Sequence, residues 1–123
     1  MKNIFNKRKA GSEAEDLAVK HLESLGYEIL ERNWHFSNRG EIDIVALDPN
    51  RWGDRYLVFV EVRSRKSSME DSIHSFDNKK QTQVKLLAPA YIRRKNIDPN
   101  YLGITFDFIA VHNGEVEHIK DVF

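Results

Sequence analysis

Two neighbouring segments of this chain read as β-strands that carry acidic residues where a core strand would carry aliphatic ones. The segments are residues 40–47 (GEIDIVAL) and 56–65 (YLVFVEVRSR). Because alternate residues of a strand share a face, Glu41 and Asp43 lie on one face of the first segment, and Glu61 and Arg63 lie together on the second. An unpaired charge in such semi-buried surroundings is costly unless it meets a cation, a metal ion or a hydrogen-bond network. The fold therefore has to supply a compensating site around these carboxylates.

The spacing of the acids suggests what that site is for. An acid on one strand, followed by an acid-x-base triplet on the next, resembles the way in which divalent-metal nucleases of the PD-(D/E)xK type hold their ion. In this chain the acid is Asp43 and the triplet is Glu61-Val62-Arg63. The resemblance implies Mg²⁺ or Mn²⁺ as a cofactor and a nucleic acid, most simply DNA, as a partner.

Length and composition restrict the class of protein. The chain has 123 residues, 41% hydrophobic and 31% charged, which suits one globular domain with a moderate core. No apolar run approaches the roughly 20 residues that a membrane span needs, so no membrane partner is expected. The basic residues 1–9 lack the apolar stretch of a secretory signal. The absence of cysteine excludes disulfides, thiolate zinc sites and cysteine nucleophiles, and fits a cytoplasmic location.

The distribution of charge matters more than its sum. The formal net charge is zero, which counts against a nucleic-acid binder. Basic residues nevertheless gather in the segment 63–95, where few acids oppose them. A basic surface beside an acidic pocket would suit a metal-dependent nuclease, although an ordinary solvated helix face explains the basic residues equally well.

The remaining pattern predicts the order helix, three strands, helix and two strands. Residues 1–10 read as a basic flexible tail, and residues 11–123 as a single domain. Ser12 and Glu15 have capping-box spacing at the start of a helix that ends near Leu25. The other expected elements are a strand at 27–34, a turn-rich connection at 48–54 between the two strands already described, a mobile loop at 66–76, a helix at 78–95 capped by Asp77 and kinked or split by Pro89, a turn at 98–100, and strands at 104–111 and 115–119.

A helix between two strands permits a parallel crossover, so we expect a mixed sheet. The segment 56–65 is the most apolar stretch and should be the central strand. We expect Val58, Val60 and Val62 to lie on a fully buried face, with both helices packed against the sheet.

Several short motifs occur in order along nearly the whole chain from Gly11. They are GSEAEDLA at 11–18, GYEIL at 26–30, RN at 32–33, GEIDIVA at 40–46, VFVEVR at 58–63, KQ at 80–81, FD at 106–107 and IKD at 119–121. In this order they resemble the YraN-like family of uncharacterised small bacterial proteins, which is similar to Holliday-junction resolvases. The resemblance implies a restriction-endonuclease-like α/β fold, a mixed sheet flanked by helices in the order α-β-β-β-α-β-β. It does not by itself establish an activity, because function depends on the site.

The resemblance also implies an active site. Glu15, Asp43, Glu61 and Arg63 would be its catalytic residues, and Asp43, Glu61 and the carbonyl of Val62 would bind Mg²⁺ or Mn²⁺. Lysine is expected at position 63. Arginine can stabilise charge on phosphate, but its pKa above about 12 prevents it from acting as a base. The expected nucleic-acid contacts are Arg39, Arg65, Lys66, Lys79, Lys80 and Gln81.

Each acid also has a structural interpretation. Glu15 fits a helix capping box, and Asp43 and Glu61 fit salt bridges to Arg63 or Arg39. A further set of residues ranks lower: Glu41 is suited to pairing with a basic neighbour, Asp107 is better explained as a structural pair inside an apolar strand, and Trp34 and Phe36 suit either base stacking or the core. The five histidines show no metal-ligand spacing.

Two functions from different classes follow. The first is a Mg²⁺-dependent endonuclease that hydrolyses phosphodiester bonds in branched or damaged DNA; similarity to resolvases then favours a homodimer, because two cuts across a junction need two-fold symmetry. The second is a catalytically silent module that binds nucleic acid or protein on the same fold. Arg63 and the neutral charge favour the second, whereas the set of Glu15, Asp43 and Glu61 favours the first.

Overall fold

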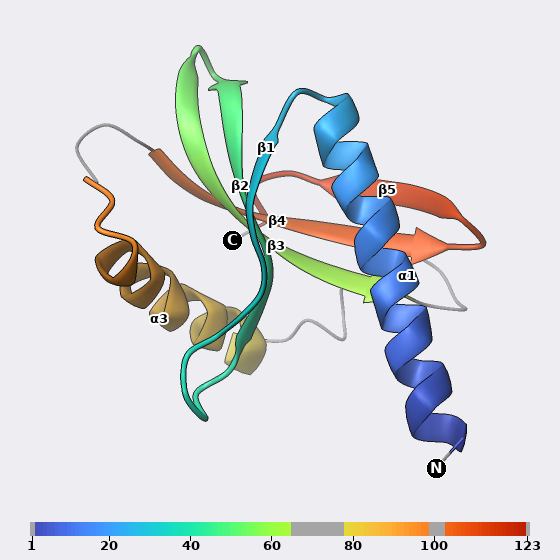
Figure 1. Cartoon of the computed structure of the whole chain (residues 1–123). Helices are drawn as coiled ribbons and strands as arrows, with labels where there is room; N and C mark the ends of the chain where they lie inside the picture. The colour runs from blue at the N-terminus through green and yellow to red at the C-terminus, as the bar shows by residue number, and fades with distance from the viewer. Residues whose placement is uncertain (1, 65–77, 99–102, 123) are drawn as a thin grey trace.

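The computed structural model shows a mixed five-stranded sheet with one helix on each face (Figure 1). It describes residues 2–64, 78–98 and 103–122, and the side chains of 2–12, 78 and 79 lie outside that description. The elements are α1 (Lys2–Ser24), β1 (Glu28–His35), β2 (Glu41–Arg51), β3 (Asp54–Ser64), α3 (Asn78–Arg94), β4 (Gly103–His112) and β5 (Glu115–Ile119). The predicted fold class and element order, α-β-β-β-α-β-β, are confirmed.

The strands lie in the sheet in the order of the sequence, β1 to β5, so β3 is central as predicted. β3 and β4 are parallel, and every other neighbouring pair is antiparallel. Parallel neighbours need a long crossover connection, and α3 belongs to the connection between these two strands.

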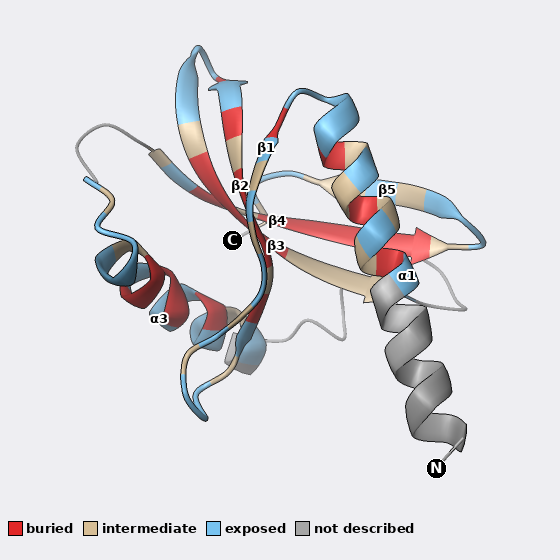
Figure 2. Ribbon diagram, viewed as in Figure 1, coloured by how far each residue is buried: buried red, intermediate tan, exposed pale blue. Residues whose placement is uncertain are grey.

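Alternation along β3 divides the core into two layers. Phe59 points toward α3 and packs in the same cluster as Tyr91, whereas Val58 and Val60 point toward α1 and pack with Leu22. All five side chains are buried, and the buried positions of both helices face the sheet (Figure 2). The α3 residues that pack in this way are Val84, Leu87, Ala88 and Tyr91, which have the spacing of one helix face.

Val62 departs from the expectation of a fully buried strand face. It is only partly buried, although it still packs against the α1-side cluster. β2 pairs with β3 only as far as Ile44 and Val60, so Val62 lies beyond the paired part of these two strands. Incomplete burial at this end of β3 is what opens the site described below.

The helix boundaries correct two expectations. α1 begins at Lys2, so Ser12 lies inside the helix and the predicted capping box is wrong. The cause is local, because residues 2–10 contain no proline or glycine and several good helix formers. α3 continues through Pro89 to Arg94 without the split that proline suggested. The loop at 66–76, the cap at Asp77 and the turn at 98–100 fall wholly or partly outside the described residues. Within the described ranges, no helix combines the length and the apolar character needed to cross a membrane.

The expected turn-rich connection at 48–54 is mostly strand. β2 continues to Arg51, and its register shifts between Asp48 and Arg51, where Pro49 lies. Proline is tolerated at such a bulge because no ladder hydrogen bond is needed there. Trp52 and Gly53, with φ of 53° and 86°, make the two-residue turn into β3.

The extra strand length buries Arg51 in a polar cluster on the α1 side of the sheet. Its two terminal nitrogens each donate to one oxygen of Asp107 at 2.7 Å, and Nη2 also donates to the Tyr27 hydroxyl at 2.7 Å. Asp48 accepts from Nε at 3.0 Å, and His118 Nε2 lies 2.6 Å from Asp107. Burial alone would raise the pKa of Asp107, but the hydrogen bonds from Arg51 and His118 outweigh it and lower the pKa to about 2. Asp107 is therefore a structural acid, as its place in an apolar strand suggested.

We predict that Asp107→Asn lowers the free energy of unfolding by about 3–5 kcal/mol, because it removes the charge of the carboxylate that binds both terminal nitrogens of the buried Arg51 and leaves only Asp48 to balance it. In the wild type, the carboxylate stabilises the fold above its unfolded pKa of about 3.9, and this contribution is lost as the pH falls toward 2. Urea unfolding at pH 7 and in the acid range measures both effects. The control Asp54→Asn, at an exposed position of β3, should change stability by less than about 0.5 kcal/mol. Equal effects of the two substitutions would contradict this account of the cluster.

Candidate active site

A pocket of about 310 Å³ opens where the ends of β2 and β3 separate, on the side of the sheet that α3 covers. Its lining comes from these two strands and from one face of α3. The lining residues are Glu41, Asp43, Glu61, Val62, Arg63, Lys80, Gln83 and Val84. The two strand segments that the sequence singled out therefore meet in one pocket.

The backbone at Asp43 is irregular. Ile42 packs in the α3-side cluster and Ile44 in the α1-side cluster, although residues two apart in a regular strand share a face. The Asp43 carboxylate accepts a hydrogen bond from the backbone N–H of Val62 at 2.8 Å. A side chain thus takes the place of a strand partner where the sheet opens, and this bond holds Asp43 against β3.

Asp43 and Glu61 form a close carboxyl pair that shares a hydrogen bond. Burial raises the pKa of Glu61 to about 8, and repulsion from Asp43 adds to the rise. Burial likewise raises the pKa of Asp43 to about 6, while the Val62 N–H opposes the rise. At neutral pH the pair therefore retains a proton that separate carboxylates would have lost.

Two cations border the pair. Arg63 Nε lies 3.1 Å from a Glu61 oxygen, but Nε makes no hydrogen bond with the described residues, so the contact is an ion pair without hydrogen-bond alignment. Both Arg63 and Lys80 lower the pKa of Glu61, yet burial and Asp43 outweigh them. The predicted salt bridge from Glu61 to Arg63 is thus present, and it does not fully neutralise the carboxyl pair.

Glu15 lies on α1 and is not among the residues that line the carboxyl pocket, but it is close enough to Asp43 for the two charges to interact. Burial raises its pKa to about 7, and the charge of Asp43 contributes to the rise. Its Oε1 atom is buried and has no hydrogen-bond partner among the described residues. Because Ser12 lies inside α1, Glu15 is not part of a helix cap. Its Oε1 atom therefore stays unpaired among the described residues.

Sequence reasoning missed Asn33. Its side chain hydrogen-bonds Glu15, and its backbone φ of 52° is unusual within a strand. The register of β1 on β2 places Asn33 opposite Asp43. The only signal for this role was the Arg32-Asn33 motif of the family resemblance.

The structure sorts the other predicted residues by position. Lys80 lines the pocket together with Gln83, because residues three apart share a helix face, whereas Gln81 is not among its lining residues. Arg39 lines a neighbouring pocket. Glu41 borders the carboxyl pocket and lies 3.9 Å from His35. Arg65, Lys66 and the side chain of Lys79 lie outside the described residues.

No three aspartate, glutamate or histidine side chains of the described residues are arranged to hold one metal ion. A site for Mg²⁺ or Mn²⁺ would instead consist of Asp43, Glu61 and the carbonyl of Val62. This donor set fits Mg²⁺, which takes hard oxygen ligands, often from only one or two carboxylates, and keeps several waters. The incompletely neutralised carboxyl pair fits such a donor set.

Comparison with known proteins gives the family. The sequence pattern of "Uncharacterised protein family UPF0102" matches residues 14–111, from α1 to β4. The chain belongs to this family. A UPF0102 protein of Flavobacterium johnsoniae is 41% identical, covering 92% of both chains. A second, from Persephonella marina, is 39% identical, covering 92% of this chain and 91% of the relative, and a third, from Rhodococcus opacus, is 34% identical, covering 92% and 94%.

We predict that the metal-free UPF0102 chain becomes less stable between about pH 5 and 8 through Glu61. A carboxyl whose native pKa is raised from about 4.3 to about 8 binds more protons in the folded state, so its stabilising effect is lost as the pH rises through that window. Glu61→Gln should therefore raise the free energy of unfolding at pH 8 by on the order of 1 kcal/mol. Urea unfolding in EDTA at both pH values provides the measurement.

The comparison between variants isolates Glu61 from other groups that titrate in this range, such as His21, whose pKa is lowered by burial. The matched control is Glu28→Gln, at an exposed position of β1, which should leave the pH dependence unchanged. If Glu61→Gln and the wild type show the same pH dependence, the strained carboxyl pair does not exist in solution.

Proposed function

We propose that this chain is a divalent-metal-dependent endonuclease that hydrolyses phosphodiester bonds, with branched or damaged DNA as its substrate. The observation that carries the proposal is the hydrogen-bonded pair of Asp43 and Glu61, which lies in a pocket that also contains Arg63 and Lys80. Burial of two carboxyls costs stability once both ionise, so the arrangement is best explained by a cation that joins them in place of the shared proton.

The metal ion would do what carboxylates alone cannot. A bound Mg²⁺ or Mn²⁺ would polarise a phosphate oxygen and lower the pKa of a water molecule. Asp43, Glu61 and the Val62 carbonyl would hold the ion, and the Val62 N–H keeps Asp43 in place on β3. Arg63 and Lys80 border the same pocket and would balance the negative charge of the phosphodiester.

Proton transfer can be assigned to Glu15. Hydrolysis forms a bond from the water oxygen to phosphorus, breaks one ester P–O bond and leaves a proton for a base to accept. Arg63 cannot accept it, because arginine stays protonated. Glu15 has a pKa of about 7, raised by burial, and a base works best when its pKa lies near the operating pH. Asn33, bonded to Glu15, would orient the carboxylate.

The second candidate is a non-catalytic module that binds nucleic acid or protein. Arginine in place of the expected lysine at position 63 and the zero net charge favour it. Metal binding distinguishes the enzyme from the non-catalytic module, because the enzyme needs an ion at Asp43 and Glu61 and the module does not. A homodimer and a cytoplasmic location remain parts of the proposal.

We predict that Asp43→Asn and Glu61→Gln each abolish Mn²⁺-dependent cleavage, because each removes a charge that holds the ion while keeping the side-chain size. A gel assay on linear, flapped, branched and single-stranded nucleic acids provides the measurement. Glu28→Gln and Asp54→Asn, both at exposed positions, should cleave like the wild type. Metal binding measured by calorimetry should be lost in the same two variants. Bound Mn²⁺ without cleavage of any substrate would favour the second candidate.

We predict that Arg63→Lys tests which base the site uses. If Glu15 accepts the proton and Arg63 binds phosphate, the substitution should raise KM several-fold with little change in kcat, because lysine lacks the planar fork that binds phosphate oxygens in pairs. Glu15→Gln should then lower kcat strongly. A higher kcat in Arg63→Lys would mean that the arginine has replaced a catalytic lysine, and it would contradict the role assigned to Glu15.

A further inference from the structure

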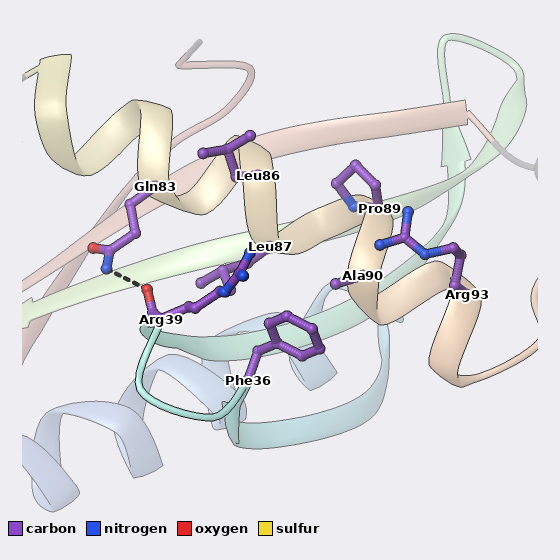
Figure 3. A pocket seen from close by; sticks show the side chains of 8 residues that line it. All are labelled: Phe36, Arg39, Gln83, Leu86, Leu87, Pro89, Ala90 and Arg93. Carbon is purple, nitrogen blue, oxygen red and sulfur yellow. Dashed lines mark hydrogen bonds between the residues drawn. The ribbon is translucent and has the colours of Figure 1, made fainter.

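A second pocket, of about 340 Å³, adjoins the carboxyl pocket. It lies between α3 and the turn that joins β1 to β2, and Figure 3 shows Phe36 facing Leu87 and Ala90 across it. We call it the Phe36 pocket; its lining residues are Phe36, Arg39, Gln83, Leu86, Leu87, Pro89, Ala90 and Arg93. Gln83 lines both pockets, so a chain-like ligand can occupy them together.

The wall of the Phe36 pocket is held in place by two contacts. Gln83 Nε2 donates to the backbone carbonyl of Arg39 at 2.5 Å, which fastens the turn to α3 (Figure 3). Gly40 has a φ of 140°, and a Cβ there would lie only 2.6 Å from Gln83 Nε2. A side chain at position 40 would therefore be strained by this φ and would displace Gln83 from its bond to the turn.

The pocket combines an aromatic ring with several cations. The guanidinium groups of Arg39 and Arg94 lie 5.9 and 5.5 Å from the centre of the Phe36 ring. Phe36 also stacks on Trp34, at 5.8 Å between ring centres and 20° between planes. Arg93 lines both this pocket and a smaller one beside it. Within the part of the chain that the structure describes, no carboxylate forms an ion pair with these three arginines.

This chemistry matches one nucleotide. The apolar surface of Leu87 and Pro89 suits the flat face of a base, Phe36 holds Arg39 and Arg94 beside it through cation–π contacts, and the arginines suit phosphate. A volume of about 340 Å³ is at the small end of the range for ligand pockets and is sufficient for a single nucleotide. A peptide is a weaker match, because an acidic one would use only the arginines and an aromatic one only the apolar wall, whereas a nucleotide uses both.

We propose that the Phe36 pocket receives an unpaired base of the strand whose phosphodiester lies at Asp43 and Glu61. The inference rests on the proposed function and specifies its substrate. A base inside a duplex would have to leave its stack and its pairing partner before it could enter, and both losses oppose binding. The protein therefore selects single strands, flaps or frayed branch points over intact duplex.

The test uses the full-length protein in EDTA, so that binding is measured without cleavage. The probes are a fluorescein-labelled single-stranded DNA, the blunt duplex of the same sequence, and an RNA of that sequence. Phe36→Leu should weaken binding of the single strand about tenfold, which corresponds to about 1.4 kcal/mol, because leucine keeps the apolar contact and loses the ring that holds Arg39 and Arg94 beside the base. Duplex affinity should change less than twofold. Trp52→Leu, an exposed aromatic outside this pocket, is the matched control and should behave like the wild type.

A second readout reports the base directly. A single strand that carries 2-aminopurine should change its fluorescence on binding to the wild type and not on binding to Phe36→Leu. If Phe36→Leu unfolds, as seen by circular dichroism, Arg93→Gln takes its place, with Arg55→Gln at an exposed position of β3 as control. Arg93→Gln should then reduce single-strand affinity more than Arg55→Gln does.

Equal losses for single strand and duplex, or no loss in either pocket variant, would overturn the proposal for the pocket. Its failure is distinguishable from failure of the proposed enzyme. Cleavage that depends on metal and is lost in Asp43→Asn, yet shows no preference for unpaired strands, is one such result. That result would support the proposed nuclease and contradict the role of the Phe36 pocket. Single-strand binding that depends on Phe36, without cleavage of any substrate, would leave the pocket and reject the nuclease.

Discussion

The central position of β3, buried on both faces, is the constraint on which the rest of the structure depends. Phe59 packs toward α3 while Val58 and Val60 pack toward α1, so both helices are positioned by one strand. The parallel pairing with β4 requires the crossover that includes α3. Beyond Val60, the last residue of β3 that pairs with β2, the two strands separate. Glu61 therefore lies in a pocket that Asp43 also lines. The site is a consequence of how this strand ends.

Two sets of buried acids show how environment decides role. Asp107 receives two hydrogen bonds from Arg51 and one from the Asp121 N–H, so its pKa falls to about 2 in spite of burial. Asp43 and Glu61 are also partly buried, but they face each other and their cations are insufficient, so both pKa values rise. The first set stabilises the fold without help. The second set keeps a proton at neutral pH, and a divalent cation in place of that proton is the physical basis of the proposed nuclease.

Patterns that depend on neighbours in the sequence were predictable. The apolar character of 56–65 identified the central strand, and Val84, Leu87 and Tyr91, at helical spacing in the sequence, are buried on the face of α3 that packs. The carboxyl pair followed from its acid-x-base spacing. The burial of Arg51 at the end of β2 was not predictable, because the proline and asparagine before it favour a turn. The ion pair with the buried Asp107, far away in the sequence, stabilises the longer strand. The helix start predicted at Ser12 was wrong because a capping motif forms no cap when the helix extends past it toward the N-terminus.

The sequence by itself determined the family, the order of the elements and the two strands that carry Asp43 and Glu61, because periodicity and short motifs are local properties. Only the tertiary structure decided which charges meet. It placed Asn33 beside Glu15, Gln83 instead of Gln81 at the pocket, and Phe36 beneath Arg39 and Arg94. These contacts join residues far apart in the chain, and they depend on a bulge, a helix face and a turn geometry that no single segment encodes. Burial and proximity then set the pKa values, which are properties of the assembled site.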